Sequence, residues 1–213
     1  MGRHKGYNRD EVLEKAMHLF WRKGYEGTHL QELVEVTGLN RFSLYKEFRG
    51  KDGLYEAAVD HYLGGLRHLS EVLNREPLGM ANILEEVRLV VFSDFPYGCF
   101  MTNALTQQEV LNERIRKRVR DFVAASEQMV LKNLEAARLR GELPPDCDIA
   151  GLAKFIVTFD IGIVTFSTTQ PTQEDKRRIY DNFRLMLTRG TGVQSPGSDE
   201  GADAPAVLAN RTR

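Results

Sequence analysis

Apolar residues recur every three or four positions through most of this chain, which is the spacing that one buried face of an α-helix requires. In the N-terminal part these apolar positions fall into short runs, and we expect helices at about 9–23, 28–37, 40–48 and 51–74. Gly24, Gly38 and Gly50 separate the runs, and glycine is the residue that most often ends a helix. The pattern therefore predicts three short helices followed by a longer one.

The residues at the helix starts agree with this division. Thr28, followed by Gln31 three positions later, fits the capping box that opens a helix. Asn40 is a favoured cap for the helix that follows the Gly38 turn. Asp10 near the start of the first helix has the charge that the helix dipole favours there.

After Pro77 the helical runs become longer and more apolar. We expect helices at about 78–93, 109–140, 148–168 and 172–189. The last stretch, 190–213, is rich in Gly, Ser, Pro and Ala and is predicted to be a disordered tail. No strand pattern competes with the helices, so the predicted fold is all-α, with a small N-terminal domain and a larger C-terminal helical domain.

Composition limits the functions that need to be considered. The chain has 213 residues, a net charge of −1 and two cysteines, with no CxxC pair and no apolar run of membrane-spanning length. Neither a signal peptide nor a membrane partner is indicated, and a cytoplasmic location is expected. Residues 1–51 nevertheless carry ten Lys or Arg against seven Asp or Glu, and Arg3, His4 and Lys5 suit an arm that lies on DNA.

Two short helices joined by a tight glycine turn, at residues 28–48, form the pattern of a helix-turn-helix. The second helix of this motif enters the DNA major groove, and only its first turns reach the base edges. Asn40, Arg41, Ser43 and Lys46 are the polar residues available there. Tyr45 is placed to set its ring along the backbone and its hydroxyl on a phosphate.

The stretch FWRKGYEGTHLQELVEVTGLNRFSLYKEFRGKDGLY resembles the DNA-binding domain of the TetR family of bacterial regulators. The matching positions are Phe20, Gly24, Tyr25, Thr28, Leu33, Gly38, Leu39, Leu44, Tyr45, Phe48, Lys51 and Leu54. The resemblance implies a three-helix helix-turn-helix domain at 1–51. It also implies a helical effector-binding and dimerisation domain at 52–189, and double-stranded operator DNA as the partner.

The resemblance also implies roles for single residues. Thr28, Tyr45 and Lys51 would hold phosphates, and residues 40–46 would read bases. Two positions depart from the family pattern, which often has a small residue where this chain has Phe42 and His where it has Glu47. We expect Phe42 to contact a thymine methyl group, and Glu47 to point at Lys51 or Arg49.

The segment PYGCFMTNALTQQE is the part of the second domain that most suggests a sensor site. A helix starting near Gly98 would put Cys99 in its first turn, where the helix dipole favours a thiolate. The segment is similar to the G-C-[LF]-x-x-N stretch of one TetR branch, some members of which sense electrophiles or oxidants. Simple packing of a small apolar residue is the alternative.

A small-molecule pocket is the wider hypothesis for the effector. Aromatic and sulfur-bearing side chains with one polar anchor would line it, and the candidates are Phe92, Phe95, Tyr97, Met101 and Asn103. Packing in an ordinary core explains aromatic clusters of this kind equally well.

The two last helices carry more bulky apolar surface than one subunit should expose. In the family, such helices from two subunits form a four-helix bundle. The candidates for this homodimer interface are Phe155, Phe159, Ile163, Phe166, Ile179, Phe183 and Met186. A two-fold dimer would set its two recognition helices about one DNA turn, roughly 34 Å, or a multiple of it, apart.

The sequence thus predicts a DNA-binding regulator, in the first place a homodimeric repressor that a small ligand or a modified cysteine releases from a palindromic operator. An activator, or a helix-turn-helix module acting through a protein partner, are the alternatives. A helical enzyme is disfavoured, because no Ser/His/Asp set, phosphate loop or HExxH motif is present. No catalytic residue, metal or cofactor is expected.

Overall fold

The computed structural model describes residues 7–190, and side chains through residue 188. Within these residues helices are the only regular secondary structure, as the apolar spacing predicts. The elements are α1 (Arg9–Lys23), α2 (Leu30–Thr37), α3 (Arg41–Phe48), α4 (Lys51–Gly65), α5 (Arg67–Leu73), α6 (Met80–Phe92), α7 (Phe100–Leu105), α8 (Glu113–Leu139), α9 (Ile149–Phe166), the 3-10 turn η1 (Ser167–Thr169) and α10 (Gln173–Gly190). The expected N-terminal arm and the expected tail beyond residue 190 lie outside the described residues.

The chain folds into two compact units, each of which is built from two separate segments of the chain. The N-terminal unit comprises the described part of Met1–Arg67 together with Phe100–Phe122. The C-terminal unit comprises His68–Cys99 and the described part of Val123–Arg213. The domain boundary expected between residues 51 and 52 stays a prediction, because compact units defined by contacts need not coincide with domains.

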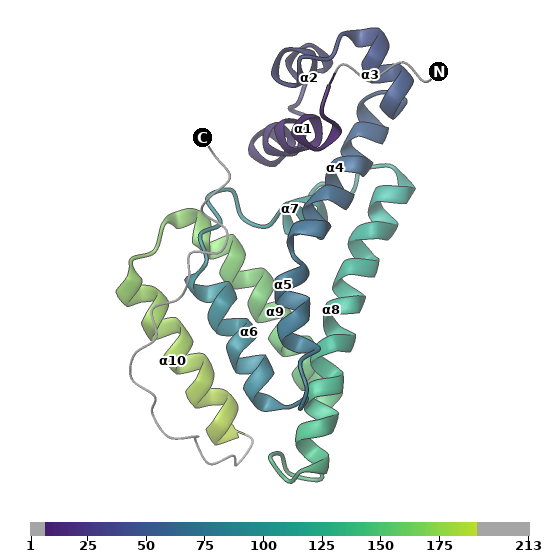
Figure 1. Cartoon of the computed structure of the whole chain (residues 1–213). Helices are drawn as coiled ribbons and strands as arrows, with labels where there is room; N and C mark the ends of the chain where they lie inside the picture. Colours follow the sequence, from purple (N-terminus) through teal and green to yellow (C-terminus); the bar gives the residue numbers. More distant parts are fainter. Residues whose placement is uncertain (1–6, 191–213) are drawn as a thin grey trace. The chain divides into compact units, whose positions relative to one another are not determined.

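In the N-terminal unit, α1 and α3 both pack against α4, and α2 packs against α1 (Figure 1). Aromatic rings fill the centre of this unit. The Tyr55 ring lies 4.9 Å from that of Phe20 and 5.2 Å from that of Phe100, which begins α7. These edge-on and tilted contacts are favourable arrangements of aromatic quadrupoles. They attach α7 to the N-terminal helices although the two are far apart in sequence.

The short helix α3 depends on its neighbours for its stability. An isolated helix of eight residues is unstable in water, because too few hydrogen bonds offset the cost of nucleation. Leu44 is fully buried and Phe48 nearly so, and they fix one face of α3 in the core. The predicted Asn40 cap is confirmed, since its Oδ1 accepts a hydrogen bond from the Ser43 N–H at 2.8 Å. The predicted turn is confirmed too, because Gly38 has a left-handed φ of 70°.

The prediction of Thr28 as the cap of α2 is wrong. Thr28 is fully buried, and its hydroxyl donates instead to the Gly24 carbonyl at 2.7 Å. His29 occupies the cap position, and its N–H donates to Glu32 Oε2 at 3.0 Å. The capping box is therefore shifted by one residue, because the Thr28 hydroxyl closes the preceding turn.

Two predicted helix boundaries also differ. The helix expected over 51–74 ends at Gly65, and α5 starts at Arg67. Two successive glycines, Gly64 and Gly65, weaken the helix at this point, because each leaves the backbone more freedom in the unfolded chain than other residues do. The helix expected near Gly98 begins only at Phe100, since Gly98 has a φ of 73° that an α-helix does not accept.

In the C-terminal unit, α6 packs against both α9 and α10 (Figure 1). A buried amide network supports the start of α6. The Asn133 side chain on α8 accepts from the Gly79 N–H at 2.9 Å and donates to the Leu73 carbonyl at 2.7 Å. Asn133 is fully buried, and these bonds satisfy both ends of its amide.

Gly53 on α4 is required by the close passage of the chain leaving α3. A Cβ atom at this position would lie 1.8 Å from the Phe48 carbonyl oxygen. We predict that Gly53→Ala lowers the free energy of unfolding by about 1–3 kcal/mol, because the backbone must shift to relieve this overlap. Urea unfolding followed by circular dichroism measures the change.

Gly64→Ala, on the same helix, is the matched control. A Cβ atom at Gly64 meets nothing within 4 Å, and alanine is the better helix former. We expect this variant to unfold at the same or a higher urea concentration than the parent. Equal losses in the two variants would show that the Phe48 carbonyl does not impose the constraint.

Candidate functional site

The outward face of α3 carries most of the residues predicted to contact DNA. Phe42 is 76% exposed and Tyr45 is 53% exposed. Asn40, Arg41 and Lys46 are exposed as well. Ser43 is half-buried, and its backbone N–H donates to the Asn40 side chain. The opposite face is buried through its apolar side chains. The helix thus presents one continuous polar and aromatic surface on an anchored support.

Tyr45 lies against the turn that joins α3 to α4. A Cβ atom added at Gly50 would be 3.1 Å from the Tyr45 Cε1 atom, so the ring covers this glycine closely. Gly50 has a φ of 100°, a conformation that residues with side chains rarely adopt. The ring therefore has a fixed backing while half of its surface stays accessible.

Lys51 lies at the first position of α4, beside Tyr25. Its Nζ atom is 4.4 Å from the centre of the Tyr25 ring and 3.5 Å from the Glu26 carbonyl oxygen. Partial burial lowers the pKa of Lys51, and the charges of Asp52 and Glu26 oppose this shift. The ring and the carbonyl oxygen hold the ammonium group in place by cation–π and polar attraction.

Tyr25 is a member of this cluster that the sequence did not single out for a site. Its hydroxyl donates to Asp52, and burial followed by this hydrogen bond raises the pKa of Tyr25 well above its ordinary value. Its backbone N–H donates to Gln107 Oε1 at 2.9 Å, just after α7. Tyr25 is one of the positions that match the family pattern, but no local pattern predicts a hydrogen-bond partner 82 positions away along the chain.

Thr28 differs from the other predicted DNA-contacting residues. It is fully buried, and its hydroxyl donates a hydrogen bond to the Gly24 carbonyl. Its side chain is therefore poorly available to a phosphate. In this position Thr28 instead fixes the turn between α1 and α2.

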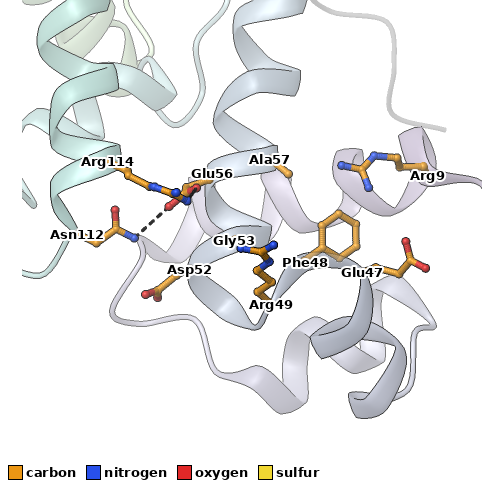
Figure 2. A pocket seen from close by; sticks show the side chains of 10 residues that line it. All are labelled: Arg9, Glu47, Phe48, Arg49, Asp52, Gly53, Glu56, Ala57, Asn112 and Arg114. Carbon is orange, nitrogen blue, oxygen red and sulfur yellow. Dashed lines mark hydrogen bonds and ion pairs between the residues drawn. The ribbon is translucent and has the colours of Figure 1, made fainter.

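An open hollow of about 480 Å³ lies beside the end of α3 (Figure 2). Its lining is mostly charged and comes from α1, α3, α4 and the start of α8: Arg9, Glu47, Phe48, Arg49, Asp52, Gly53, Glu56, Ala57, Asn112 and Arg114. The Arg9 guanidinium lies 4.9 Å from the centre of the Phe48 ring. Three arginines and three acids balance one another, and small-molecule pockets are usually more apolar than this.

One side of this hollow ties α4 to the start of α8. Glu56 Oε1 accepts from the Asn112 amide at 3.3 Å, and Glu56 Oε2 lies 3.5 Å from Arg114 Nη1. One turn further along, Arg118 and Asp60 form an ion pair at 2.6 Å. Figure 2 shows Asn112 and Arg114 reaching toward Glu56. The beginning of α8 is thereby attached to α4, the helix that follows α3.

The predicted effector residues are divided between the two compact units. Phe92, Phe95, Tyr97 and Cys99 belong to the C-terminal unit, whereas Met101 and Asn103 belong to the N-terminal unit. Phe95 and Met101 are buried, Phe92 and Asn103 are half-buried, and Tyr97 is 41% exposed. A common pocket lined by all of them stays a prediction.

Cys99 is the last residue of its segment in the C-terminal unit, and α7 begins directly after it. It is 6% exposed and forms no disulfide with Cys147. Because Cys99 precedes α7 rather than lying in its first turn, the expected effect of the helix dipole on the thiol loses part of its basis. The burial slows access of any reagent to the sulfur.

The predicted dimer residues separate into an exposed and a buried group. Phe155 and Phe166 are each 45% exposed, and Met186 is 57% exposed. Phe159 and Ile179 are half-buried. Ile163 and Phe183 are buried inside the unit, where the Phe183 ring lies 4.4 Å from that of Phe159.

The exposed apolar residues give α9 an unusual character for a helix at a surface. Ile149–Thr169 is the one stretch among the described residues that is long and apolar enough to span a membrane, and a third of its most apolar window is buried. Length and composition alone do not distinguish a membrane helix from one that packs against another protein surface. Within residues 7–190, no group of three or more His, Cys, Asp or Glu side chains is placed to hold a metal ion.

Comparison with known proteins agrees with the geometry of the N-terminal helices. The family model for bacterial regulatory proteins of the tetR family matches residues 12–58. A second model, the tetracyclin repressor-like C-terminal domain, matches residues 81–182. The first match contains α2, α3 and the first half of α4, and the second contains α7, α8, α9 and all but the first residue of α6.

Individual relatives extend over most of the chain. The HTH-type transcriptional repressor ComR of Escherichia coli (strain K12) is 35% identical over 161 residues, which are 73% of this chain and 77% of that protein. The regulator YezE of Bacillus subtilis (strain 168) is 29% identical over 195 residues, 88% of this chain and 98% of that protein.

A solved structure gives the same result. A cysteine-substituted variant of the TetR family regulator CifR, complexed with a 26-base-pair operator DNA, aligns with a TM-score of 0.74 and 28% identity. The alignment covers 89% of this chain and all of that one. The chain therefore belongs to the tetR family of bacterial regulatory proteins, which are DNA-binding transcriptional regulators.

Proposed function

We propose that this chain is a cytoplasmic, homodimeric transcriptional repressor that binds a palindromic operator through α3. The observation that carries the proposal is the two-sided character of α3 and its cap: Leu44 and Phe48 are buried, whereas Asn40, Arg41, Phe42, Tyr45 and Lys46 are exposed. A surface of this kind on a helix anchored by its other face fits the major groove, which admits one helix. Repression is the activity that the names of ComR and other relatives print.

The exposed residues of α3 divide the work of recognition. Arg41 and Lys46 supply donors for base edges, and Asn40 stands at the start of the helix, where the groove is approached first. Ser43 is half-buried and supports the cap. The Phe42 ring is 76% exposed and suits contact with a thymine methyl group.

Tyr45 and Lys51 hold the backbone of the DNA in this proposal. The Tyr45 ring is backed by Gly50, and the Lys51 ammonium group by the Tyr25 ring and the Glu26 carbonyl. Contacts to phosphates set the register of a protein on DNA but carry no direct sequence information. The buried Thr28 acts indirectly, by fixing the turn before α2.

The homodimer rests on the apolar surface of α9 and α10. Phe155, Phe166 and Met186 present large side chains that water would otherwise contact. A second copy related by a two-fold axis covers the same residues on both subunits, as an isologous interface requires. The same dimer supplies the two recognition helices that a palindromic operator needs.

Release follows from a shift between two forms of the dimer. A small ligand, or modification of Cys99, favours the form whose half-site spacing does not fit the operator, and affinity for DNA falls by the same coupling free energy. The chain passes between its two units at residues 67/68, 99/100 and 122/123, the last of these inside the continuous helix α8. These covalent crossings are the connections through which the units influence each other.

The partner-protein alternative is separated from this proposal by salt. Neutralisation of phosphates by Lys and Arg releases counterions, so operator affinity must fall steeply as the salt concentration rises. An activator would bind the same operator, and only a transcription assay separates activation from repression.

For the recognition surface, we predict that Arg41→Ala and Tyr45→Ala each weaken operator binding by about 1–3 kcal/mol, roughly tenfold or more. The operator is selected from a random duplex pool with the parent protein, and fluorescence anisotropy gives the dissociation constants. Arg120→Ala is the matched control, because Arg120 on α8 pairs with Glu113 and lies outside α3. Unchanged affinity in both α3 variants would contradict the assignment of α3 as the recognition helix.

For the interface, we predict that Phe155→Glu and Phe166→Glu each raise the dimer dissociation constant. Loss of a large apolar anchor costs about 2 kcal/mol, and the two-fold axis doubles the effect to roughly a thousandfold. Sedimentation velocity measures the monomer fraction. Leu139→Glu is the control, because Leu139 is 88% exposed at the end of α8; dissociation by this variant alone would place the interface elsewhere.

For the thiol branch of the release mechanism, we predict that N-ethylmaleimide dissociates the parent–operator complex but not the complex of Cys99→Ser. The reaction is expected to be slow, since Cys99 is buried. Cys147→Ser, which removes the more accessible thiol, should respond like the parent. Equal release from the parent and Cys99→Ser would leave ligand binding as the only route.

A further inference from the structure

Two carboxyl groups lie in the interior of the C-terminal unit without a hydrogen-bond partner for their buried oxygens. Glu86 stands on α6 and is 7% exposed, and its Oε2 atom is inaccessible to solvent and unpartnered. Asp160 stands on α9, the helix packed against α6, and its Oδ1 atom is buried and unpartnered in the same way. Asp160 as a residue is half-buried, so its exposure lies outside this oxygen.

Several other charged side chains on the packed helices have partners. Arg88 on α6 makes a two-pronged ion pair with Glu85, and Lys154 on α9 pairs with Glu127 on α8 at 2.6 Å. Lys176 on α10 is buried, but it donates to Asp94 at 2.8 Å and to the Ser93 carbonyl. The Tyr180 hydroxyl donates to the Leu84 carbonyl, and Asp181 and Arg184 lie on the same helix nearer to solvent. Glu86 and Asp160 differ from these side chains, because each has a buried oxygen without a hydrogen-bond partner.

Burial without a partner is costly for a carboxylate. It raises the pKa of Glu86 well above its usual range. Burial, and then repulsion from Glu86, raises the pKa of Asp160 as well. An acid with a raised pKa keeps its proton in the folded state when the unfolded chain has lost it, so the pair lowers stability as pH rises above the ordinary carboxyl range.

We propose that Glu86 and Asp160 form the binding site for a lipophilic organic cation, with an ammonium or amidinium group between the two carboxyls, and that this cation is the effector that releases the operator. The effector role rests on the proposed function, whereas the binding site does not. With a monovalent ligand, one carboxyl is ionised and the other keeps its proton, so the charges balance.

The surroundings of the pair define the chemistry of the ligand. Buried aliphatic residues stand beside each carboxyl in the sequence of its helix: Ile83, Val87 and Val90 on α6, and Ile156, Val157, Ile163 and Val164 on α9. The half-buried Phe159 directly precedes Asp160. An apolar body suits these side chains, and the cationic head suits the two orphaned acceptors.

A bare metal ion fits this pair poorly. Hard divalent cations take six or more oxygen ligands, and within residues 7–190 no third His, Cys, Asp or Glu joins the pair in a metal-binding group. An organic cation needs fewer polar contacts, because its own carbon atoms fill the remaining space. The two-carboxyl arrangement therefore favours the organic ligand.

Binding at this place has a direct consequence for α6. The cationic head must enter between α6 and α9, two helices in contact, so the packing of α6 changes when the ligand binds. The chain leaving α6 at Phe92 reaches α7 of the N-terminal unit within eight residues. A displaced α6 therefore pulls on the segment that holds Cys99.

The test compares a cation with a neutral molecule of the same shape on the full-length protein. Benzamidine is the cationic probe and benzamide its neutral counterpart, and thermal shift and calorimetry at pH 5.5 and 8.5 are the measurements. We expect benzamidine to bind and to stabilise the parent more at pH 8.5, where fewer protons compete for the carboxyls, and benzamide to do neither.

Isosteric variants locate the binding. Glu86→Gln and Asp160→Asn should each weaken benzamidine binding at least about tenfold, the loss expected for one charge-assisted hydrogen bond, and Glu86→Gln alone should raise the melting temperature. Glu85→Gln is the matched control and should bind like the parent, because Glu85 pairs with Arg88. Absence of benzamidine binding to the parent, parent-like affinity in both Glu86→Gln and Asp160→Asn, or a thermal shift with MnCl₂ equal to that with benzamidine would overturn the site.

The operator arm separates the site from its role. Benzamidine should lower the operator affinity of the parent and leave that of Glu86→Gln unchanged. Binding of the cation without this effect would overturn the effector role. If the parent binds no operator at all, the proposed function fails, and calorimetry still decides the cation site by itself.

Discussion

The burial of Leu44 and Phe48 is the constraint on which the N-terminal unit depends. A helix of eight residues has no stability of its own in water, so α3 depends on the burial of these two side chains where it packs against α4 and α2. The exposed face of α3 then makes no contribution to the core. The same constraint explains the tight turns on either side, since Gly38 and Gly50 let the chain enter and leave α3 without a side chain in the way.

Much of this arrangement follows from local sequence rules. The apolar spacing predicts the helices, Asn40 predicts the start of α3, and Gly38 predicts the turn before it. Local rules fail where the deciding partner is distant or unusual. Thr28 has a side chain suited to a helix cap, but its hydroxyl donates a hydrogen bond to the carbonyl of the residue four positions earlier. The break after Gly65 depends on two glycines that apolar periodicity alone passes over.

The candidate sites show the same division. Exposed residues on α3 are predictable, because a short capped helix leaves few choices for the buried face. The role of Tyr25 and Asp52 in holding Lys51 is not, since their hydrogen bond joins residues 27 positions apart. The orphaned pair of Glu86 and Asp160 is even less visible in the sequence, where each acid stands in an ordinary helical context. Only the packing of α6 against α9 brings them into one interior.

The C-terminal unit carries two features that are unfavourable for a subunit alone. One is the apolar surface of α9 and α10, and the other is the buried pair of acids. In the proposals made above, a second subunit covers the apolar surface and an organic cation neutralises the pair of acids. Operator DNA is the third partner, and its contact with α3 is the central claim. Hydroxyl-radical footprinting of the parent protein on its selected operator tests this claim most directly. The account predicts two protected patches on one side of the duplex, with centres about one helical turn, or a multiple of it, apart. A single protected patch, or uniform protection that is the same on every DNA sequence, would contradict it.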